Sequence, residues 1–275
     1  MTTAMCIASL VVLTNACGRL SVDTHGARAV SYVPSGGTEV FATLSDGSGG
    51  MPICWPWFGD GGREGARRHG IARYEDFRVV RKTESPDVAE LELRLDSSVA
   101  TKAEFPFDFS LSVVFRLAEA GVSVTMTARN TGDRPFRVTE MFHPYFAVAN
   151  PRSCRVEGSF GSVAVPCDGS HRHAFPDDGD HAYLLFDPEG GRRISLSSFG
   201  DSGVAVWNPG PNPVVSSKIT SRLDPGDWRR FVCVENGTYD PSAAYRLAPG
   251  AAHTLLLEIS SSDISQQQKE KGKIP

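Results

Sequence analysis

The chain has 275 residues, of which 40% are hydrophobic and 22% charged, so it holds enough apolar residues for one sizeable core. This length suits one large β domain or two small ones. The formal net charge of −4 and the isoelectric point near 6.0 argue against nucleic acid as the main partner, because phosphate backbones require a surplus of lysine and arginine.

The N-terminal segment and the six cysteines bear on the compartment. Residues 5–13 are apolar like the centre of a signal peptide, but no lysine or arginine precedes them. No apolar run reaches the ~20 residues that a membrane-spanning helix needs. The scattered cysteines, without CxxC pairs, indicate reduced thiols rather than a disulfide framework or a zinc site. We expect a cytoplasmic protein without a membrane segment, and an exported form is the alternative.

Five segments alternate apolar and polar residues with the period of two that is typical of strands. In chain order they are residues 88–95, 107–117, 122–130, 136–142 and 253–259. Turn sequences rich in glycine and proline separate them, and no long stretch has helical spacing. The pattern predicts an all-β fold, a large antiparallel sandwich or barrel with few short helices. We expect one domain over residues 1–260 and a polar tail over residues 261–275.

The composition of residues 49–59, an aromatic segment, is unusual for a segment with only a structural role. It holds two tryptophans, one phenylalanine and two prolines, and cannot be a regular central strand because proline lacks the ladder donor. Aromatic faces such as that of Trp55 stack on the C–H faces of sugars, so the segment is a candidate wall of a sugar site. The alternative is a proline-rich corner that fills the core.

A histidine follows the fourth of these segments. In an extended chain His143 and Tyr145 share one face, and Pro144 favours an extended conformation at His143. Such a histidine is a candidate acid or base. The alternative is a core or surface residue that merely has its hydrogen bonds satisfied.

A carboxylate ends a strand that is apolar on both faces. Period two places Cys233 and Glu235 on one face of residues 231–235 and valines on the other, so we expect this strand to be covered on both sides. A buried carboxylate needs a partner or a function. Burial would raise its pKa toward values useful for a general base. A structural ion pair is the alternative.

Two further polar features are weaker. Asp180 and the sequence Val-Trp-Asn-Pro over residues 206–209 are, taken singly, an exposed acid and a turn. His171 and His173 alternate as metal ligands could, but they lie in a stretch that we expect to be a loop, and the sequence offers no obvious third ligand. We therefore expect no metal site.

Five motifs, taken together and in this order, resemble one family. They are Gly-Gly-Met-Pro-Ile-Cys-Trp-Pro-Trp-Phe-Gly, His-Gly-Ile-Ala-Arg, Phe-His-Pro-Tyr-Phe, Val-Trp-Asn-Pro-Gly and Phe-Val-Cys-Val-Glu. The chain is similar, over about residues 11–259, to the glucose-6-phosphate 1-epimerases of the aldose 1-epimerase superfamily. The resemblance implies a β-sandwich of the galactose mutarotase type and interconversion of the anomers of a hexose or hexose 6-phosphate without a cofactor.

The resemblance also implies roles for single residues. His143 is expected to be the general acid toward the ring oxygen, and Glu235 the general base toward the anomeric hydroxyl. His69 and Asp180 resemble residues that hold the ring oxygen and hydroxyls, and Arg73 resembles a basic substrate contact. The segment around Trp55 would shape the wall of the site.

One departure concerns the phosphate. Members of this family usually carry arginine where this chain has Ser48. Arg63, Arg67 and Arg68 are candidates to compensate, and a solvated basic loop is the alternative. A general aldose 1-epimerase acting on free sugars therefore remains open. So do a non-catalytic carbohydrate-binding protein and an accessory part of a carbohydrate lyase or hydrolase. We expect a small-molecule substrate and a monomer or weak dimer.

Overall fold

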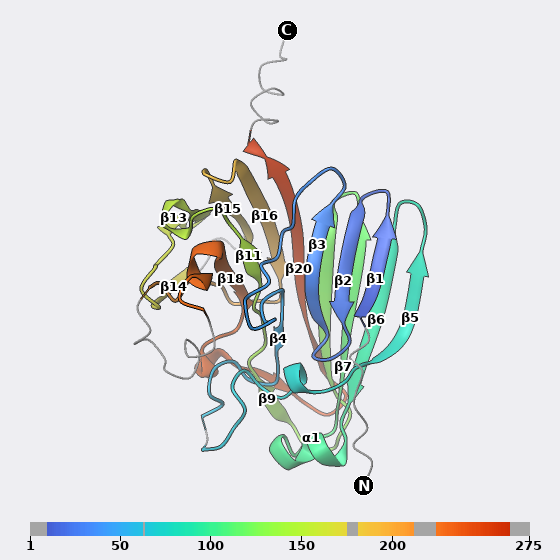
Figure 1. The fold of residues 1–275 in the computed structure, drawn as a ribbon. Helices are drawn as coiled ribbons and strands as arrows, with labels where there is room; N and C mark the ends of the chain where they lie inside the picture. The colour runs from blue at the N-terminus through green and yellow to red at the C-terminus, as the bar shows by residue number, and fades with distance from the viewer. Residues whose placement is uncertain (1–9, 63, 175–180, 212–223, 265–275) are drawn as a thin grey trace.

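The computed structural model describes residues 10–62, 64–174, 181–211 and 224–264, with the side chains of residues 173 and 174 also left out of the description. Antiparallel strands dominate and form two layers (Figure 1). The predicted all-β class with few, short helices is confirmed. The one described α-helix, α1 (Val99–Glu104), has six residues, and Ser98 and Thr101 form a capping box at its start.

One layer is a nine-stranded sheet. Its spatial order is β13 (Gly161–Ala164), β12 (Arg155–Gly158), β15 (Ala182–Asp187), β16 (Arg192–Phe199), β20 (Ala252–Asp263), β8 (Gly121–Asn130), β7 (Phe109–Ala118), β6 (Ala89–Asp96) and β5 (Arg78–Glu84).

The facing layer holds two smaller sheets. A three-stranded sheet of β1 (Leu10–Asn15), β2 (Gly18–Asp23) and β3 (Arg28–Pro34) contacts β6 and β7. Beside it is a six-stranded sheet in the order β14 (His171–Ala174), β17 (Val204–Trp207), β18 (Phe231–Gly237), β10 (Met141–Phe142) and β4 (Ile53–Cys54), with β11 (Tyr145–Ala147) also paired to β18.

Short elements complete the description. A two-stranded sheet joins β9 (Phe136–Val138) and β19 (Tyr245–Leu247). Single 3₁₀ turns lie at Ala72–Tyr74, Pro151–Ser153, Asp227–Arg230 and Pro241–Ala243.

The main core lies between the two layers. Alternation in β6 buries Ala89, Leu91, Leu93 and Leu95 and leaves their neighbours partly exposed. The valines of β18, residues 232 and 234, belong to the same buried cluster as the inward residues of β16 and β20. Because both faces of β18 are buried, as predicted, this strand can carry a charged side chain only at a considerable desolvation cost.

Two details differ from the prediction. The segment 136–142 is not one strand, because β9 pairs with β19 while β10 joins the six-stranded sheet, and Thr139 between them donates its backbone N–H to Pro56. The last strand, β20, also continues past residue 260, to Asp263, and pairs with β16 there.

Among the described residues, no helix has the length and apolar character to cross a membrane. The five described cysteines, residues 17, 54, 154, 167 and 233, form no disulfide with one another.

Candidate active site

His143 and Glu235 lie opposite each other across two paired strands. The antiparallel register pairs Phe142 with Asn236 and Tyr145 with Cys233, so the same register places His143 across from Glu235. Pro144 falls between β10 and β11, where a strand residue without a backbone N–H interrupts the ladder. The backbone N–H of His143 instead donates to the carbonyl of Pro52, at 3.0 Å, which ties the histidine to the aromatic segment.

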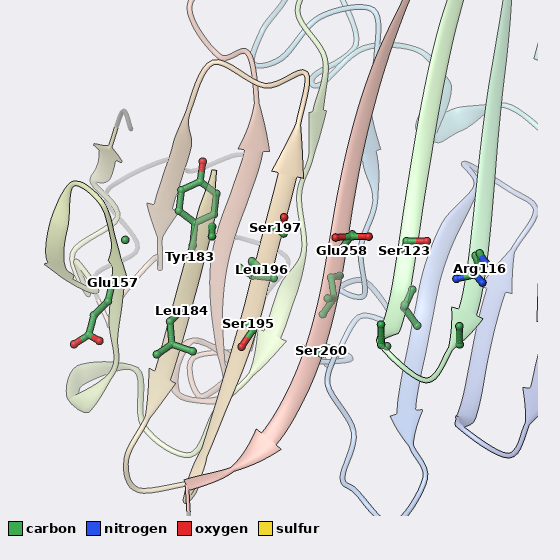
Figure 2. A pocket seen from close by; sticks show the side chains of 17 residues that line it. Arg116, Ser123, Glu157, Tyr183, Leu184, Ser195, Leu196, Ser197, Glu258 and Ser260 are labelled. Atoms are coloured by element: carbon green, nitrogen blue, oxygen red, sulfur yellow. The ribbon is translucent and has the colours of Figure 1, made fainter. Parts of the chain in front are cut away.

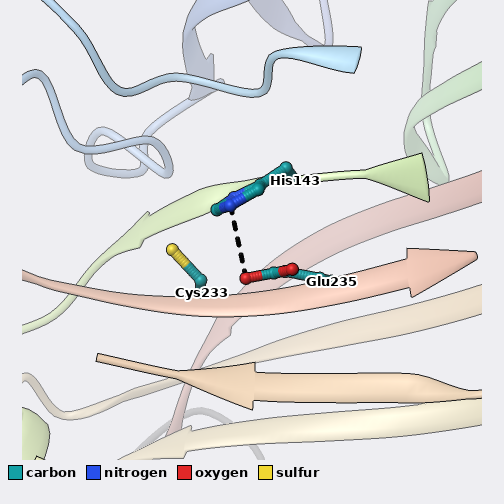
Figure 3. Close-up of side chains that lie close together, drawn as sticks. All are labelled: His143, Cys233 and Glu235. Carbon is teal, nitrogen blue, oxygen red and sulfur yellow. Dashed lines mark ion pairs between the residues drawn. The ribbon is translucent and has the colours of Figure 1, made fainter. Parts of the chain in front are cut away.

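The two side chains are in contact and almost completely buried. His143 Nε2 lies 3.4 Å from Glu235 Oε1, and the two side chains are 8% and 0% exposed (Figure 3). The contact does not have hydrogen-bond geometry, and neither carboxylate oxygen of Glu235 has a hydrogen-bond partner among the described residues. A buried carboxylate that accepts no hydrogen bond from the described residues is expensive in a folded protein, which points to a function.

Burial sets the protonation of the pair. It raises the pKa of Glu235 from 4.5 to about 8, although the positive charges of Arg73 and Arg68 act in the opposite direction. Burial, with the charge of Arg73 as the next cause, holds the pKa of His143 well below 6.5. Near neutral pH the pair therefore carries one proton between its two members, which is the state required for moving a proton from one oxygen to another.

His69 lies beside the pair. Its ring packs edge-on against that of His143, with centroids 5.4 Å apart, and against Phe58 at 4.8 Å. His69 has a positive φ of 63°, and Arg68 Nε lies 2.9 Å from its Nε2. Burial and then Arg73 lower its pKa well below 6.5, so the ring is neutral. The structure thus brings this predicted contact residue to His143.

Ser48 and Arg73 line one cavity, of about 310 Å³. Tyr145 also lines it, and the Tyr145 ring stacks on His143 with centroids 5.0 Å apart, so the cavity adjoins the pair. Arg28, which the sequence analysis did not single out, lines the same cavity and forms a 3.6 Å ion pair with Asp23. Nothing in the polar pattern of β3 distinguishes this arginine from an ordinary surface residue.

The role expected for Trp55 needs correction. Its side chain is 0% exposed and packs in the core against Phe105 and Phe109, with ring centroids at 5.4 and 4.4 Å. An indole with no exposed surface has no face to offer a sugar, so Trp55 supports the wall from behind. From the same segment, Phe58 packs against His69 and lies 6.4 Å from the His143 ring.

Of three other predicted residues, two are not described by the structure and one is engaged in other ion pairs. Asp180 and Arg63 lie outside the described residues. Arg67 forms ion pairs with Glu75 and Glu104, so its charge is already engaged.

The His171–His173 stretch was expected to be a loop, and this is wrong. Residues 171–174 form β14, which pairs with β17. The His171 ring stacks on Trp207, with centroids 5.8 Å apart, and its charge acts on both His143 and His69. The side chain of His173 lies outside the described part of the chain.

A larger hollow of about 530 Å³ lies on the outer face of the nine-stranded sheet (Figure 2). Its two carboxylates, Glu157 and Glu258, come from β12 and β20, which are three strand spacings apart, or about 14 Å. That is too far for the paired carboxylates of a glycosidase, and no histidine is among the lining residues. The His143–Glu235 pair is therefore the better candidate for acid–base chemistry.

Comparison with known proteins agrees with this geometry. The family model for aldose 1-epimerase matches residues 9–260. This chain belongs to the aldose 1-epimerase family. Two bacterial relatives, from Salmonella typhimurium and Escherichia coli, are each 30% identical to it over 82% of both chains, and both are named as candidate glucose-6-phosphate 1-epimerases.

Solved structures share the fold. A candidate mutarotase from Salmonella typhimurium superimposes with a TM-score of 0.81 at 25% identity, covering 92% of this chain and 90% of that one. A galactose mutarotase-like protein from Lactobacillus casei gives a TM-score of 0.74 at 18% identity, covering 92% and 100%. The predicted mutarotase-type fold and the family resemblance are confirmed.

Proposed function

We propose that this member of the aldose 1-epimerase family interconverts the α and β anomers of a hexose 6-phosphate by acid–base catalysis. The observation that carries the proposal is the buried His143–Glu235 pair, with 3.4 Å between an imidazole nitrogen and a carboxylate oxygen. A non-catalytic sugar-binding protein would have no use for a carboxylate buried at this cost.

The pair supplies both proton transfers that the reaction needs. In ring opening, Glu235 accepts the proton of the anomeric hydroxyl while His143 donates one to the ring oxygen, and the C1–O5 bond breaks to leave an aldehyde. Rotation about the C1–C2 bond presents the other aldehyde face, and the same two transfers run backward to close the ring. No electrons are gained or lost, so these transfers require no redox partner. Each positioned acid or base contributes roughly 10²–10⁴-fold.

The electrostatics of the pair suit a reversible reaction. The two protonation states that the cycle uses, imidazolium with carboxylate and imidazole with carboxylic acid, hold the same number of protons. Burial disfavours charge on both groups, and Arg73 favours the carboxylate charge on Glu235 but opposes a positive charge on His143. At rest the pair is therefore neutral, imidazole with carboxylic acid, and moving one proton from Glu235 to His143 gives the charged state without exchange with solvent.

The cavity of Arg28, Ser48 and Arg73 is the proposed place for the 6-phosphate. Two guanidinium groups can bind a dianion through charge-assisted hydrogen bonds, and the Ser48 hydroxyl can donate another. Arg28 would thus supply the charge that the family usually provides at position 48. A phosphorylated substrate is retained inside cells, so we place the reaction in the cytoplasm, performed by a monomer or weak dimer.

A general aldose 1-epimerase is the second candidate. It is favoured by Asp23, whose carboxylate lines the same cavity and already pairs with Arg28. A carboxylate there suits the hydroxyl groups of a free hexose better than it suits a phosphate.

Polarimetry on freshly dissolved α anomers separates these candidates. Rates would be measured with glucose 6-phosphate and with glucose, for the unmutated protein and for Glu235→Gln. We expect acceleration over buffer with both sugars, a higher kcat/KM for the phosphate, and loss of acceleration in the variant. Equal kcat/KM for the two sugars would favour the general epimerase, and no acceleration with either would refute an epimerase.

A further inference from the structure

Cys233 is a buried thiol beside the catalytic pair that the proton transfers do not use. It precedes Glu235 by two residues on β18, so both side chains project from the same face. Figure 3 shows its sulfur directed into the space that the His143 ring and the Glu235 carboxyl also face. The thiol is 0% exposed, and burial raises its pKa well above 9.0.

We propose that His143, Cys233 and Glu235 form a three-ligand site for a thiophilic divalent cation of the Zn²⁺ type, and that such an ion inhibits the enzyme by occupying its acid–base pair. The inhibition rests on the proposed function, whereas the metal site stands without it. The open fourth position would be filled by water or by a sugar oxygen.

The separations of the donor atoms fit tetrahedral zinc. With bonds of about 2.0–2.3 Å, two ligand atoms on one tetrahedral zinc ion lie about 3.3–3.6 Å apart. The histidine nitrogen and the glutamate oxygen are 3.4 Å apart without the ion. One donor atom from each of the three residues lies within 4.8 Å of the other two donor atoms. To reach the separations found around zinc, the Cys233 sulfur must therefore move only about an ångström closer to the other two.

The donor atoms are also free to bind. Both oxygens of Glu235 lack a hydrogen-bond partner among the described residues, so an ion would displace no existing bond to them. Zn²⁺ would be neutralised by one thiolate and one carboxylate, and the protons of Cys233 and Glu235 would pass to the solvent. The nearby charges of Arg73 and Arg68 oppose the ion but also favour the negative charge of the Glu235 carboxylate.

The kind of donor selects the kind of ion. Imidazole and thiolate suit zinc, cobalt and cadmium, whereas magnesium and calcium require oxygen ligands and would gain only one carboxylate here. The site is therefore expected to discriminate between these two classes of divalent cation.

Cobalt binding tests the site without reference to activity. Co²⁺ added to the metal-free protein should give a thiolate-to-cobalt charge-transfer band in the near ultraviolet, with one equivalent bound. Cys233→Ala should abolish the band, and Cys233→Ser gives the same test with a side chain of nearly unchanged size. Cys154→Ala is the matched control, because Cys154 is also buried and lies 3.8 Å from a carboxylate oxygen of Asp187. A band that persists in both Cys233 variants, or no band in the unmutated protein, would overturn the site.

Inhibition is tested by epimerisation rates with added Zn²⁺. We expect zinc to slow the reaction, EDTA to restore it, and Mg²⁺ to have no effect. Loss of an outer partner of a metal ligand alone costs ~10–100-fold in affinity, so each Cys233 variant should need at least about tenfold more zinc, relative to its own metal-free rate. The same zinc sensitivity in these variants would overturn the inhibition. Cobalt bound through Cys233 in a protein that epimerises no sugar would uphold the site and refute the proposed function.

Discussion

Replacing Glu235 by glutamine should change how the stability of the protein depends on pH. The folded-state pKa of Glu235 is about 8, raised from 4.5 by burial. A group whose pKa is raised on folding stabilises the fold most at low pH, and this contribution is lost as pH rises through the folded-state value. Between about pH 4.5 and 8, the unmutated protein should therefore lose stability because of this carboxyl group.

The magnitude follows from the two pKa values. Each unit of difference corresponds to about 1.4 kcal/mol, so the full effect of Glu235 is about 5 kcal/mol. Most surface carboxylates are ionised throughout the range from about pH 5.5 to 9. Over this range the same linkage lowers the free energy of unfolding of the unmutated protein by about 3 kcal/mol. Glutamine keeps the shape of the side chain and carries no proton to lose, so the variant should lack this loss.

Urea unfolding at several pH values measures the difference. The free energy of unfolding of Glu235→Gln, minus that of the unmutated protein, should rise by about 3 kcal/mol from pH 5.5 to 9. The opposite contribution of His143, whose lowered pKa reduces stability as pH falls below 6.5, is present in both proteins and largely cancels. Glu119→Gln, at an exposed turn residue, is the control and should show no such rise. If the difference in free energy of unfolding between the two proteins does not change with pH, the claim that Glu235 is buried with a raised pKa is refuted.

Four further predictions concern activity. His143→Asn and Glu235→Gln should each lower turnover at least roughly a hundredfold, and the double variant should lose far less than the product of the two, because the groups act in one step. In the unmutated protein kcat/KM should fall above about pH 8, as the pair loses its single proton, and should hold down to below pH 6.5. Arg28→Ala and Arg73→Ala should lower kcat/KM at least about tenfold for glucose 6-phosphate and much less for glucose, with the preference shrinking in added salt. Prolonged dialysis against EDTA should leave the rate unchanged.

The sequence predicts local structure well where one face of a strand is buried. The alternating segments 88–95 and 122–130 lie within a residue of β6 and β8, because period-two burial is a local property of the chain. Segment 136–142 shows the same pattern but divides between two sheets. The division depends on partners distant in sequence, such as Pro56 and β19, which periodicity does not reveal.

The sequence singled out the two members of the proposed catalytic pair as candidates, but it did not show that they are in contact. Apolar neighbours on both faces indicated that Glu235 is buried, and Pro144 indicated an extended chain at His143. That the two side chains face each other depends on the register of β10 and β11 with β18, which lies about ninety residues further along the chain. From the sequence, only the family resemblance indicated that His143 and Glu235 act together.

The composition of the aromatic segment was misleading about Trp55. Tryptophan is common both in sugar-binding sites and in hydrophobic cores. Here Trp55 is in the core because it packs on Phe105 and Phe109, which lie some fifty residues further along the chain. Arg28, in contrast, was not singled out from the sequence although it lines the cavity. It reaches the cavity of Arg73 only because the three-stranded sheet lies beside the six-stranded one.

The most direct test of the catalytic claim is exchange NMR of the two anomers at equilibrium. The H1 signals of α- and β-glucose 6-phosphate are resolved, and cross peaks between them report interconversion without a coupled enzyme. We predict strong cross peaks with the unmutated protein and none above buffer with Glu235→Gln at the same concentration of folded protein. Cross peaks of equal strength with both proteins would contradict the assignment of Glu235 as the base and, with it, the proposed mechanism.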